Sequence, residues 1–315
     1  MTASSKPALD TPSLATIVLT YNEEIHIARC LESIRTFCGE IFVIDSFSTD
    51  DTVEIARRHG ATVLQNPFVN QAIQFQWALD HIATDATWLL RIDADEVVED
   101  DLAREIREDL PKLAKDIVGV HLNRKHIFLG RWIAHGGRYP LHLLRLWRRG
   151  FGRVEQSWMD EHIVVWGGRT VNFVGGFRDH NLQDISFFID KHNHYATREA
   201  TKAFARRRSL AGFDDDASDG LAGQAGRKRI VKRAFYDNLP FPIGPTLYFL
   251  YRYTAQLGFL DGVEGLVYHF LQGFWYRFVV GVKLIELERQ IPRDLDPHIA
   301  RKELARLTRL AVLAE

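Results

Sequence analysis

The sequence predicts an α/β protein with an open mixed sheet covered by helices on both faces, followed by a mainly helical C-terminal segment. Three observations carry this prediction. Short apolar runs alternate with helical patterns over the first hundred residues, as in right-handed βαβ units. Polar side chains follow these runs, at the points where the strands of such a sheet would end. The last third of the chain is rich in basic and aromatic residues.

Four apolar runs predict the first strands. Residues 14–19 form a continuous apolar run, as expected of a strand buried on both faces of a parallel sheet. The other predicted strands are residues 41–44, 61–64 and 88–92. A later apolar run predicts a further strand over residues 143–147.

Helices are predicted between these strands. Residues 22–24 open the first, whose apolar side chains Ile27, Leu31 and Ile34 recur at helical spacing. Capping side chains at 48–51 precede a second helix that Gly60 ends. The remaining predicted helices are residues 71–81 and one that starts at 191–195.

Composition limits the class of protein. The 315 residues are 46% hydrophobic and 26% charged, an ordinary globular mixture. Forty Lys and Arg against forty-one Asp and Glu give no global excess of positive charge, so no nucleic-acid partner is expected. Cys30 and Cys38 are the two cysteines, which favours a reducing, cytoplasmic setting without structural zinc. No signal peptide, membrane-spanning run or glycine-rich phosphate loop is expected.

Asp93 and Asp95 follow the fourth predicted strand directly. Two carboxylates at positions i and i+2, where a strand gives way to a loop, can face one cavity. Their oxygens are ligands for Mg²⁺ or Mn²⁺, with the other positions left to water and a diphosphate. The alternative is that Asp95 and the acids after it only cap and solvate the following helix. The position beyond the carboxyl end of a buried strand favours ligation, because ligands of such sheets bind there.

Three ordered motifs resemble those of the family 2 inverting glycosyltransferases, which have a GT-A fold. They are residues 16–24 (TIVLTYNEE), 44–52 (IDSFSTDDT) and 91–96 (RIDADE). The resemblance covers roughly residues 14–185 and is nearest to bacterial enzymes of lipopolysaccharide core, O-antigen or exopolysaccharide biosynthesis. It implies a base pocket lined by Thr20, Tyr21 and Glu23, with Asp45 near the base or ribose. It also implies that Asp93 lies near the ribose or the metal and that Asp95 binds the metal and the diphosphate. The donor it implies is a nucleotide sugar, with UDP as the first choice of nucleotide.

An inverting transferase needs a base that removes the proton of the acceptor hydroxyl. Residues 157–162 (SWMDEH) resemble the family's acidic catalytic motif, with Glu161 as the first choice of base and Asp160 as the alternative. Arg131 and Arg138, in a loop with aromatic residues and glycines, are candidates for contacts to the diphosphate. His180 is a candidate third metal ligand, because a late histidine has this role in some GT-A enzymes.

The organisation implied is a flexible N-terminus (1–13), a catalytic domain (14–195) and a helical segment (196–315) at a membrane interface or in an oligomer contact. Within the catalytic domain, residues 14–110 form the nucleotide-sugar half and residues 111–195 the acceptor half. Basic clusters at 206–208 and 227–233 beside aromatic-rich helices fit an anionic membrane surface. The enzyme would then be cytoplasmic, peripheral on the inner face of the membrane, and would act on a lipid-linked glycan or lipopolysaccharide. A homo-oligomer is possible because the same aromatics can pack on a second subunit.

Three other functions stay open at this point. A HAD-type phosphatase also uses Asp-x-Asp, but normally after its first strand. A nucleotidyltransferase would need a glycine-rich basic segment after the first strand, which residues 21–23 do not supply. A non-catalytic membrane scaffold would carry the basic and aromatic tail without binding nucleotide and metal.

Overall fold

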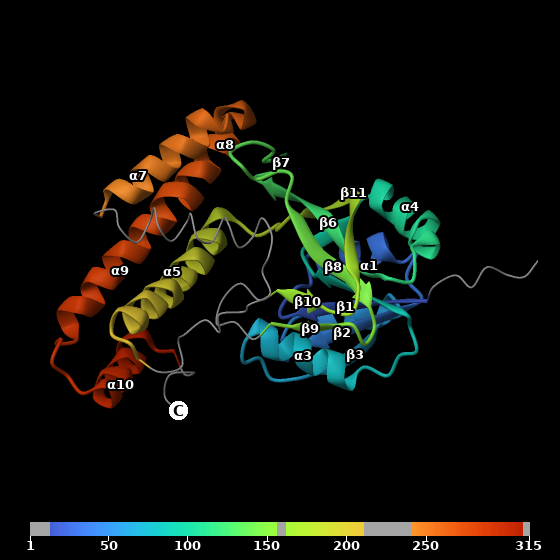
Figure 1. Ribbon diagram of the computed structural model, residues 1–315, viewed down its shortest axis with the longest axis horizontal. Coiled ribbons are helices and arrows are strands. Elements are labelled where there is room, and N and C mark those ends of the chain that lie inside the picture. Colours follow the sequence, from blue (N-terminus) through green and yellow to red (C-terminus); the bar gives the residue numbers. More distant parts are fainter. Residues whose placement is uncertain (1–12, 156–161, 211–240, 311–315) are drawn as a thin grey trace, which may run out of the picture. The chain divides into compact units, whose positions relative to one another are not determined.

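The computed structural model describes residues 13–155, 162–210 and 241–310. The chain divides into two compact units (Figure 1). The sheet unit comprises Met1–Trp132 and Arg138–Leu182, and the helical unit comprises Ile133–Gly137 and Gln183–Glu315. The domain boundary expected at 195/196 therefore falls inside a helix of the second unit, and a short segment of the predicted acceptor half belongs to the helical unit.

The sheet unit contains a mixed sheet whose main path has the order β3-β2-β1-β4-β8-β6-β11-β5, with β7 paired to β6. Strands β1, β2, β3 and β4 are parallel, whereas β8 and β5 run antiparallel to their neighbours. Its strands are β1 (Leu14–Thr20), β2 (Glu40–Asp45), β3 (Thr62–Gln65), β4 (Trp88–Asp93), β5 (Glu96–Val98), β6 (Ile117–Phe128), β7 (Arg131–Trp132), β8 (His142–Arg148) and β11 (Arg169–Asp179), and β9 (Gly152–Val154) pairs separately with β10 (Ile163–Val165). The open mixed sheet with helices that the sequence predicts is confirmed.

Helices cover both faces of this sheet because its central strands are apolar on both sides. Along β1, Leu14 and Val18 join a core with α1 and α4, while Ala15 and Ile17 join a second core with α3. The helices of this unit are α1 (Ile27–Ile34), α2 (Thr52–Arg58), α3 (Gln71–His81), α4 (Asp100–Glu108) and the single turn η1 (Leu110–Lys112). Two buried layers therefore fix the strands, and their carboxyl ends form one defined edge.

The helical unit is built around α5, which packs along α9 (Figure 1). Asp184 caps α5 by accepting a hydrogen bond from the N–H of Phe187 (2.8 Å), so this helix begins six residues before the expected start at Lys191. The elements are α5 (Ile185–Arg207), α7 (Ile243–Leu250), η2 (Tyr251–Ala255), η3 (Gly258–Asp261), α8 (Gly262–Tyr268), η4 (His269–Trp275), α9 (Tyr276–Gln290) and α10 (Pro297–Thr308). None of the helices in the described part of the chain has both the length and the apolar character to cross a bilayer.

Candidate active site

The polar residues expected to bind donor lie along one edge of the sheet. Thr20 at the end of β1 is in register with Asp45 at the end of β2, and Leu19 is in register with Asp93 at the end of β4. Strands β6 and β11 run in the same direction as β4, because two antiparallel steps through β8 restore it. Six strands, β1, β2, β3, β4, β6 and β11, therefore bring their carboxyl ends to this edge, which is where ligands of open α/β sheets bind.

Asp45 is fully buried and organises the loops above β1 and β2. Its carboxylate accepts hydrogen bonds from Thr20 Oγ1 (3.2 Å), from the Ser48 amide (3.0 Å) and hydroxyl (2.5 Å), and from Gln65 Nε2 (3.0 Å). A buried carboxylate needs such donors because it has lost its water. The predicted contact with base or ribose stays a prediction, and the hydrogen bonds described here fix the loops after β1 and β2.

The loop after β1 is bonded to the loop after β2. Asn22 has a left-handed backbone (φ 54°), its N–H donates to Ser48 Oγ (2.9 Å), and its side chain accepts from the Thr49 N–H (2.9 Å). The Glu23 N–H donates to Thr52 Oγ1 (2.7 Å). Residues 22–24 are therefore a turn rather than the predicted helix start, and α1 begins at Ile27. Tyr21 is 58% exposed, which leaves its ring accessible to a nucleobase.

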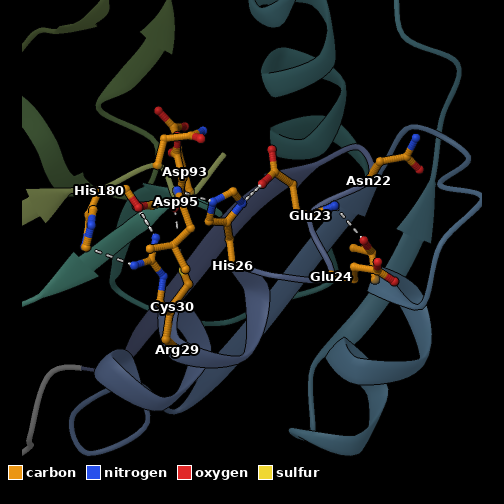
Figure 2. A network of polar contacts seen from close by, with 12 residues as sticks. Asn22, Glu23, Glu24, His26, Arg29, Cys30, Asp93, Asp95 and His180 are labelled. Carbon is orange, nitrogen blue, oxygen red and sulfur yellow. Dashed lines mark hydrogen bonds and ion pairs between the residues drawn. The ribbon is translucent and has the colours of Figure 1, made fainter. Parts of the chain in front are cut away.

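His26 joins this loop to the end of β11. Its Nε2 accepts a hydrogen bond from the Leu182 N–H (2.8 Å), so its Nδ1 carries the proton and donates to Glu23 Oε2 (2.5 Å). The ring is buried. Glu23, predicted for the base pocket, is thus held by a histidine that also fixes the chain just beyond His180 (Figure 2).

Asp93 is held by two arginines. Its Oδ2 accepts from Arg145 on β8 (3.1 Å) and its Oδ1 lies 3.4 Å from Nε of Arg91. Although burial opposes ionisation, these cations hold the pKa of Asp93 well below its ordinary value. Arg145 also donates to Glu96 Oε1 (3.0 Å), while Glu96 Oε2 accepts from the Asp93 N–H (2.9 Å). Burial raises the pKa of Glu96 to about 8 against the effect of Arg145.

Asp95 and His180 are joined through their backbones. The His180 N–H donates to the Asp95 carbonyl (3.1 Å), and the Asp95 carboxylate accepts from the Asn181 amide (3.1 Å). Figure 2 shows Arg29 of α1 beside both residues. Its guanidinium donates to His180 Nδ1 (3.2 Å), to the His180 carbonyl and to the Asp95 carbonyl (3.4 Å). Burial and the charge of Arg29 lower the pKa of His180, so the ring is neutral near pH 7.

The ends of β6 and β11 carry a second buried network. Asp179 accepts hydrogen bonds from Arg124 and from His126 Nδ1 (2.9 Å). Although burial opposes ionisation, these two donors hold the pKa of Asp179 well below its usual range. Burial lowers the pKa of His126, and the nearby charge of Arg138 contributes to this effect. Arg138, a predicted diphosphate ligand, is thereby placed beside the end of β6.

The loop between β6 and β8 presents aromatic and basic side chains. Trp132 meets Tyr139 edge to face, with ring centroids 5.0 Å apart, and the ammonium of Lys125 lies 5.4 Å from the Trp132 ring centre. Arg131, the other predicted diphosphate ligand, is exposed on β7. A polar cleft of about 330 Å³ lies next to this group, lined by Val98, Glu99, Asp100, Asp101, Lys125 and Arg178.

The predicted base is not part of the described structure. Glu161 and Asp160 both lie outside the described residues. The described residues on either side of this stretch are hydrogen-bonded to each other: the Glu155 N–H donates to the His162 carbonyl (2.8 Å).

The carboxylate oxygens and the histidine nitrogen at this edge fit a divalent cation that also binds oxygens of a ligand. Within residues 13–155, 162–210 and 241–310, no three His, Cys, Asp or Glu side chains gather closely enough to hold a metal by themselves. The Asp95 carboxylate accepts a hydrogen bond from the Asn181 amide, whereas Asp93 is paired with Arg145 and Arg91. His180 can offer a nitrogen lone pair only where Arg29 now donates. One or two protein ligands with diphosphate oxygens and water are a normal set for Mg²⁺.

Several residues that shape the site were not predicted, notably Arg145, Arg29, Asn181 and the pair Arg124 and Asp179. For Arg145 the sequence contained a signal. A single charged residue stands inside the apolar run 143–147, as Arg91 does inside 88–92. A charge in a buried strand requires a buried partner. For Arg29 and Asn181 no such signal exists, because neither interrupts a predicted buried strand.

Comparisons with known proteins agree with the motifs. The profile of glycosyl transferase family 2 matches residues 16–180. The lipopolysaccharide core biosynthesis glycosyltransferase LpsC of Rhizobium meliloti (strain 1021) is 28% identical over 274 residues, which cover 82% of this chain and 89% of that protein. The uncharacterized glycosyltransferase RT0209 of Rickettsia typhi (strain ATCC VR-144 / Wilmington) is 40% identical over 93 residues, only 30% of this chain and 31% of that protein.

Among solved structures, glucosyl-3-phosphoglycerate synthase from Mycobacterium tuberculosis, in complex with Mn²⁺, UDP and glucosyl-3-phosphoglycerate, is similar with a TM-score of 0.30 and 21% identity. The similarity covers 39% of this chain and 50% of that one.

Proposed function

Because the chain belongs to glycosyl transferase family 2, we propose that it transfers a hexosyl unit from a nucleotide diphosphate sugar to an acceptor hydroxyl, with inversion. One observation carries this proposal. The ends of β1, β2, β4 and β11 bring the polar residues of all three motifs to one edge of the sheet, beside Asp95 and His180. Family membership favours this function over a phosphatase or a nucleotidyltransferase.

The donor is proposed to be a UDP-sugar that lies across this edge. In this proposal the base stacks near exposed Tyr21, and the loop joined by Asn22, Ser48 and Thr52 forms its pocket wall. The donor-binding residues are Thr20, Tyr21, Glu23, Asp45, Asp93, Arg131 and Arg138. Paired hydrogen bonds from Arg131 and Arg138 would hold the diphosphate oxygens.

We propose Mg²⁺ or Mn²⁺ as the cofactor, held by Asp95 and by His180 once Arg29 releases the ring, with Asp93 at the side of the ribose. When bound, the cation supplies positive charge to the departing diphosphate. The chain's own part is to orient these donors. Asn181 orients the carboxylate of Asp95, and the Asp95 carbonyl fixes the backbone of His180. Arg145 holds Asp93 in its ionised form.

The transfer step needs one base on the face of the sugar opposite the diphosphate. In our proposal the carboxylate of Glu161, or of Asp160, takes the proton of the acceptor hydroxyl. The acceptor oxygen forms a bond to the anomeric carbon while the bond from that carbon to the diphosphate oxygen breaks. The bonding electron pair leaves with the nucleoside diphosphate, and the configuration at the anomeric carbon inverts.

The acceptor is proposed to be a lipid-linked glycan or lipopolysaccharide at the inner face of the cytoplasmic membrane. The similarity to LpsC over most of the chain supports a role in lipopolysaccharide core biosynthesis. An anionic membrane surface is the proposed partner of the basic cluster, of which residues 206–208 are described.

Calorimetry with UDP and Mn²⁺ tests the donor site. Asp95→Ala should lose the Mn²⁺-dependent part of UDP binding, while Asp100→Ala, an exposed acid in the first turn of α4, should keep it. Glu161→Gln should keep donor binding and lose transfer; if Asp160→Asn does so instead, the base moves by one residue. Unchanged Mn²⁺-dependent binding in Asp95→Ala, or no stabilisation of the wild-type chain by any nucleotide sugar in a panel, would contradict the proposal.

A further inference from the structure

The segment from Phe241 to Trp275 exposes apolar side chains on both of its arms. We call it the hairpin: α7 and η2 form its first arm, η3 its tip, and α8 and η4 its second arm. Large exposed hydrophobic residues occur on the first arm, at the tip and on the second arm, with Val263 71% exposed: Phe241, Ile243, Leu247, Leu250, Tyr251, Leu257, Phe259, Leu260, Val263, Leu266 and Phe270. Every residue of the hairpin is described, and none of the exposed ones is charged.

Of the three Asp, Glu and Arg residues of the hairpin, Arg252 and Asp261 lie inside it, whereas Glu264 in the first turn of α8 is half-buried. Arg252 and Asp261 are 4% and 3% exposed, and His269 is fully buried. Arg252 Nε donates to the carbonyl of Gly136 (2.8 Å). Asp261 accepts from the N–H of His135 (2.9 Å) and lies 2.6 Å from its Nδ1.

These partners belong to the segment Ile133–Gly137, which is part of the helical unit. The Gly136 N–H donates to the carbonyl of Gln256 (2.9 Å), and a Cβ on Gly136 would lie 2.1 Å from the His269 ring. The segment therefore fits tightly into the hairpin and forms hydrogen bonds with its buried Arg252 and Asp261. The hairpin therefore buries Arg252, Asp261 and His269 and exposes large apolar side chains, an arrangement unusual for a helix pair surrounded by water.

We propose that the hairpin inserts into the apolar layer of one membrane leaflet and attaches the protein to it. A contact with a second protein would cover one face of the hairpin and leave a polar rim around it. Here both arms and the tip expose apolar side chains, and the charged residue among them that is not buried, Glu264, is half-buried. A lipid environment is the partner that accepts such a surface from all sides at once, because it needs no polar rim.

The dimensions of the hairpin fit insertion rather than crossing. The first arm, Ile243–Ala255, is about 20 Å long at 1.5 Å per residue, and the hydrocarbon core is about 30 Å thick. A turn inside lipid must satisfy its own backbone groups. At the tip, the N–H groups of Gln256, Leu257 and Leu260 donate to carbonyls within the hairpin at 3.0 Å each.

Insertion has a consequence that rests on the proposed function. Ile133 directly follows Trp132, and Gly137 directly precedes Arg138, so the buried segment is continuous in the chain with the proposed diphosphate ligands Arg131 and Arg138. Insertion would therefore hold in the membrane a chain segment that is continuous with the loop carrying these two arginines.

Vesicle flotation of the full chain tests the insertion. The wild-type chain should float with neutral phosphatidylcholine vesicles and should remain bound in about 1 M salt, where charges are screened beyond roughly 3 Å. Val263→Asp should weaken flotation roughly tenfold or more, since an aspartate is costly in the apolar layer. The matched control is Val174→Asp on β11, at a valine that is 83% exposed in the sheet unit, and it should float like the wild type. Leu247→Asp repeats the test on the first arm.

Three results would overturn the inference. The first is flotation only with anionic vesicles and only at low salt, which would assign attachment to the basic cluster. The second is equal flotation of Val263→Asp and Val174→Asp. The third is a dimer of the wild type that Val263→Asp converts to monomer without any effect on flotation, which would assign the hairpin to a second copy.

Two controls separate insertion from folding and from the proposed function. Without lipid, Val263→Asp should melt at the wild-type temperature, because the side chain faces outward; a large loss would mean that the hairpin is covered by protein and would count against insertion. UDP binding with Mn²⁺ should be equal in Val263→Asp and the wild type. If the wild-type chain floats but never binds a nucleotide, the proposed function fails while insertion stands.

Discussion

Replacing Arg145 by leucine should be among the most destabilising single changes in the sheet unit. Arg145 is buried and donates to both Asp93 (3.1 Å) and Glu96 (3.0 Å). Its removal leaves the Asp93 carboxylate and the buried Glu96 carboxyl group close together, with Arg91 still 3.4 Å from Asp93. Removing one partner of a buried ion pair costs about 3–5 kcal/mol. That is a large part of a total stability of about 5–15 kcal/mol.

The direction in which stability changes with pH distinguishes the loss of a buried cationic partner from a simple loss of packing. In the wild type Arg145 opposes the effect of burial on both carboxyls. Without it, the pKa of Glu96 rises further above that of the unfolded chain and the pKa of Asp93 rises as well, so the folded state holds protons that the unfolded chain releases. The stability of Arg145→Leu should therefore fall as pH rises through the folded pKa values and recover partly toward about pH 5.

Urea denaturation of Arg145→Leu and of the double variant Arg145→Leu/Glu96→Leu measures the effect. The double variant should recover part of the lost free energy, because it removes one of the two stranded carboxylates. A loss below about 1 kcal/mol, or a loss that is the same at every pH, would refute the reasoning, since exposed ion pairs behave in that way.

Two further predictions concern one buried carboxyl group in each unit, that of Glu96 in the sheet unit and that of Asp261 in the helical unit. Because the folded pKa of Glu96 is raised to about 8, wild-type stability should decline as pH rises from about 5 to 8, by at most about 1.4 kcal/mol per unit. Glu96→Gln should flatten that decline in urea titrations, and an unchanged slope would contradict the raised pKa. Asp261→Ala should cost about 1–3 kcal/mol and speed amide hydrogen exchange at 133–137, because His135 loses both of its bonds to the carboxylate. Exchange as slow as in the wild type would mean that Arg252 and Gln256 suffice to hold the segment.

The strands of the sheet unit were predictable because their signals are local. The run at 14–19 became β1, buried on both faces, and the helix expected over 71–81 is α3 with those bounds. The start of the first helix was predicted wrongly at 22–24. In the structure the N–H groups of Asn22 and Glu23 donate to Ser48 and Thr52, which lie in the loop after the next strand. A hydrogen bond between residues that far apart in the chain leaves no pattern in the local sequence.

The start of α5 shows the opposite case, since its signal was present in the sequence. Asp184 followed by apolar residues is an ordinary capping pattern, whereas the predicted start lies at the polar run 191–195. The hairpin was only half predictable. Its aromatic and apolar composition indicated a membrane surface, but the turning of Arg252 and Asp261 to the inside depends on the segment Ile133–Gly137, more than a hundred residues earlier in the chain.

Asp45, Asp93 and Asp95, the three motif aspartates predicted to bind the donor or the metal, differ in the groups that surround them. Asp45 is buried among neutral donors, so it can shape a pocket but cannot meet a cation without opening the loop. Asp93 is ionised but neutralised by Arg145 and Arg91, which suits it to accept hydrogen bonds from a neutral group such as a ribose hydroxyl. Asp95 accepts from the amide of Asn181, and the resemblance to the family assigns the metal to it. Since Asp93 is already paired with two arginines, exchanging Asp95 for asparagine should weaken Mn²⁺ binding more than exchanging Asp93.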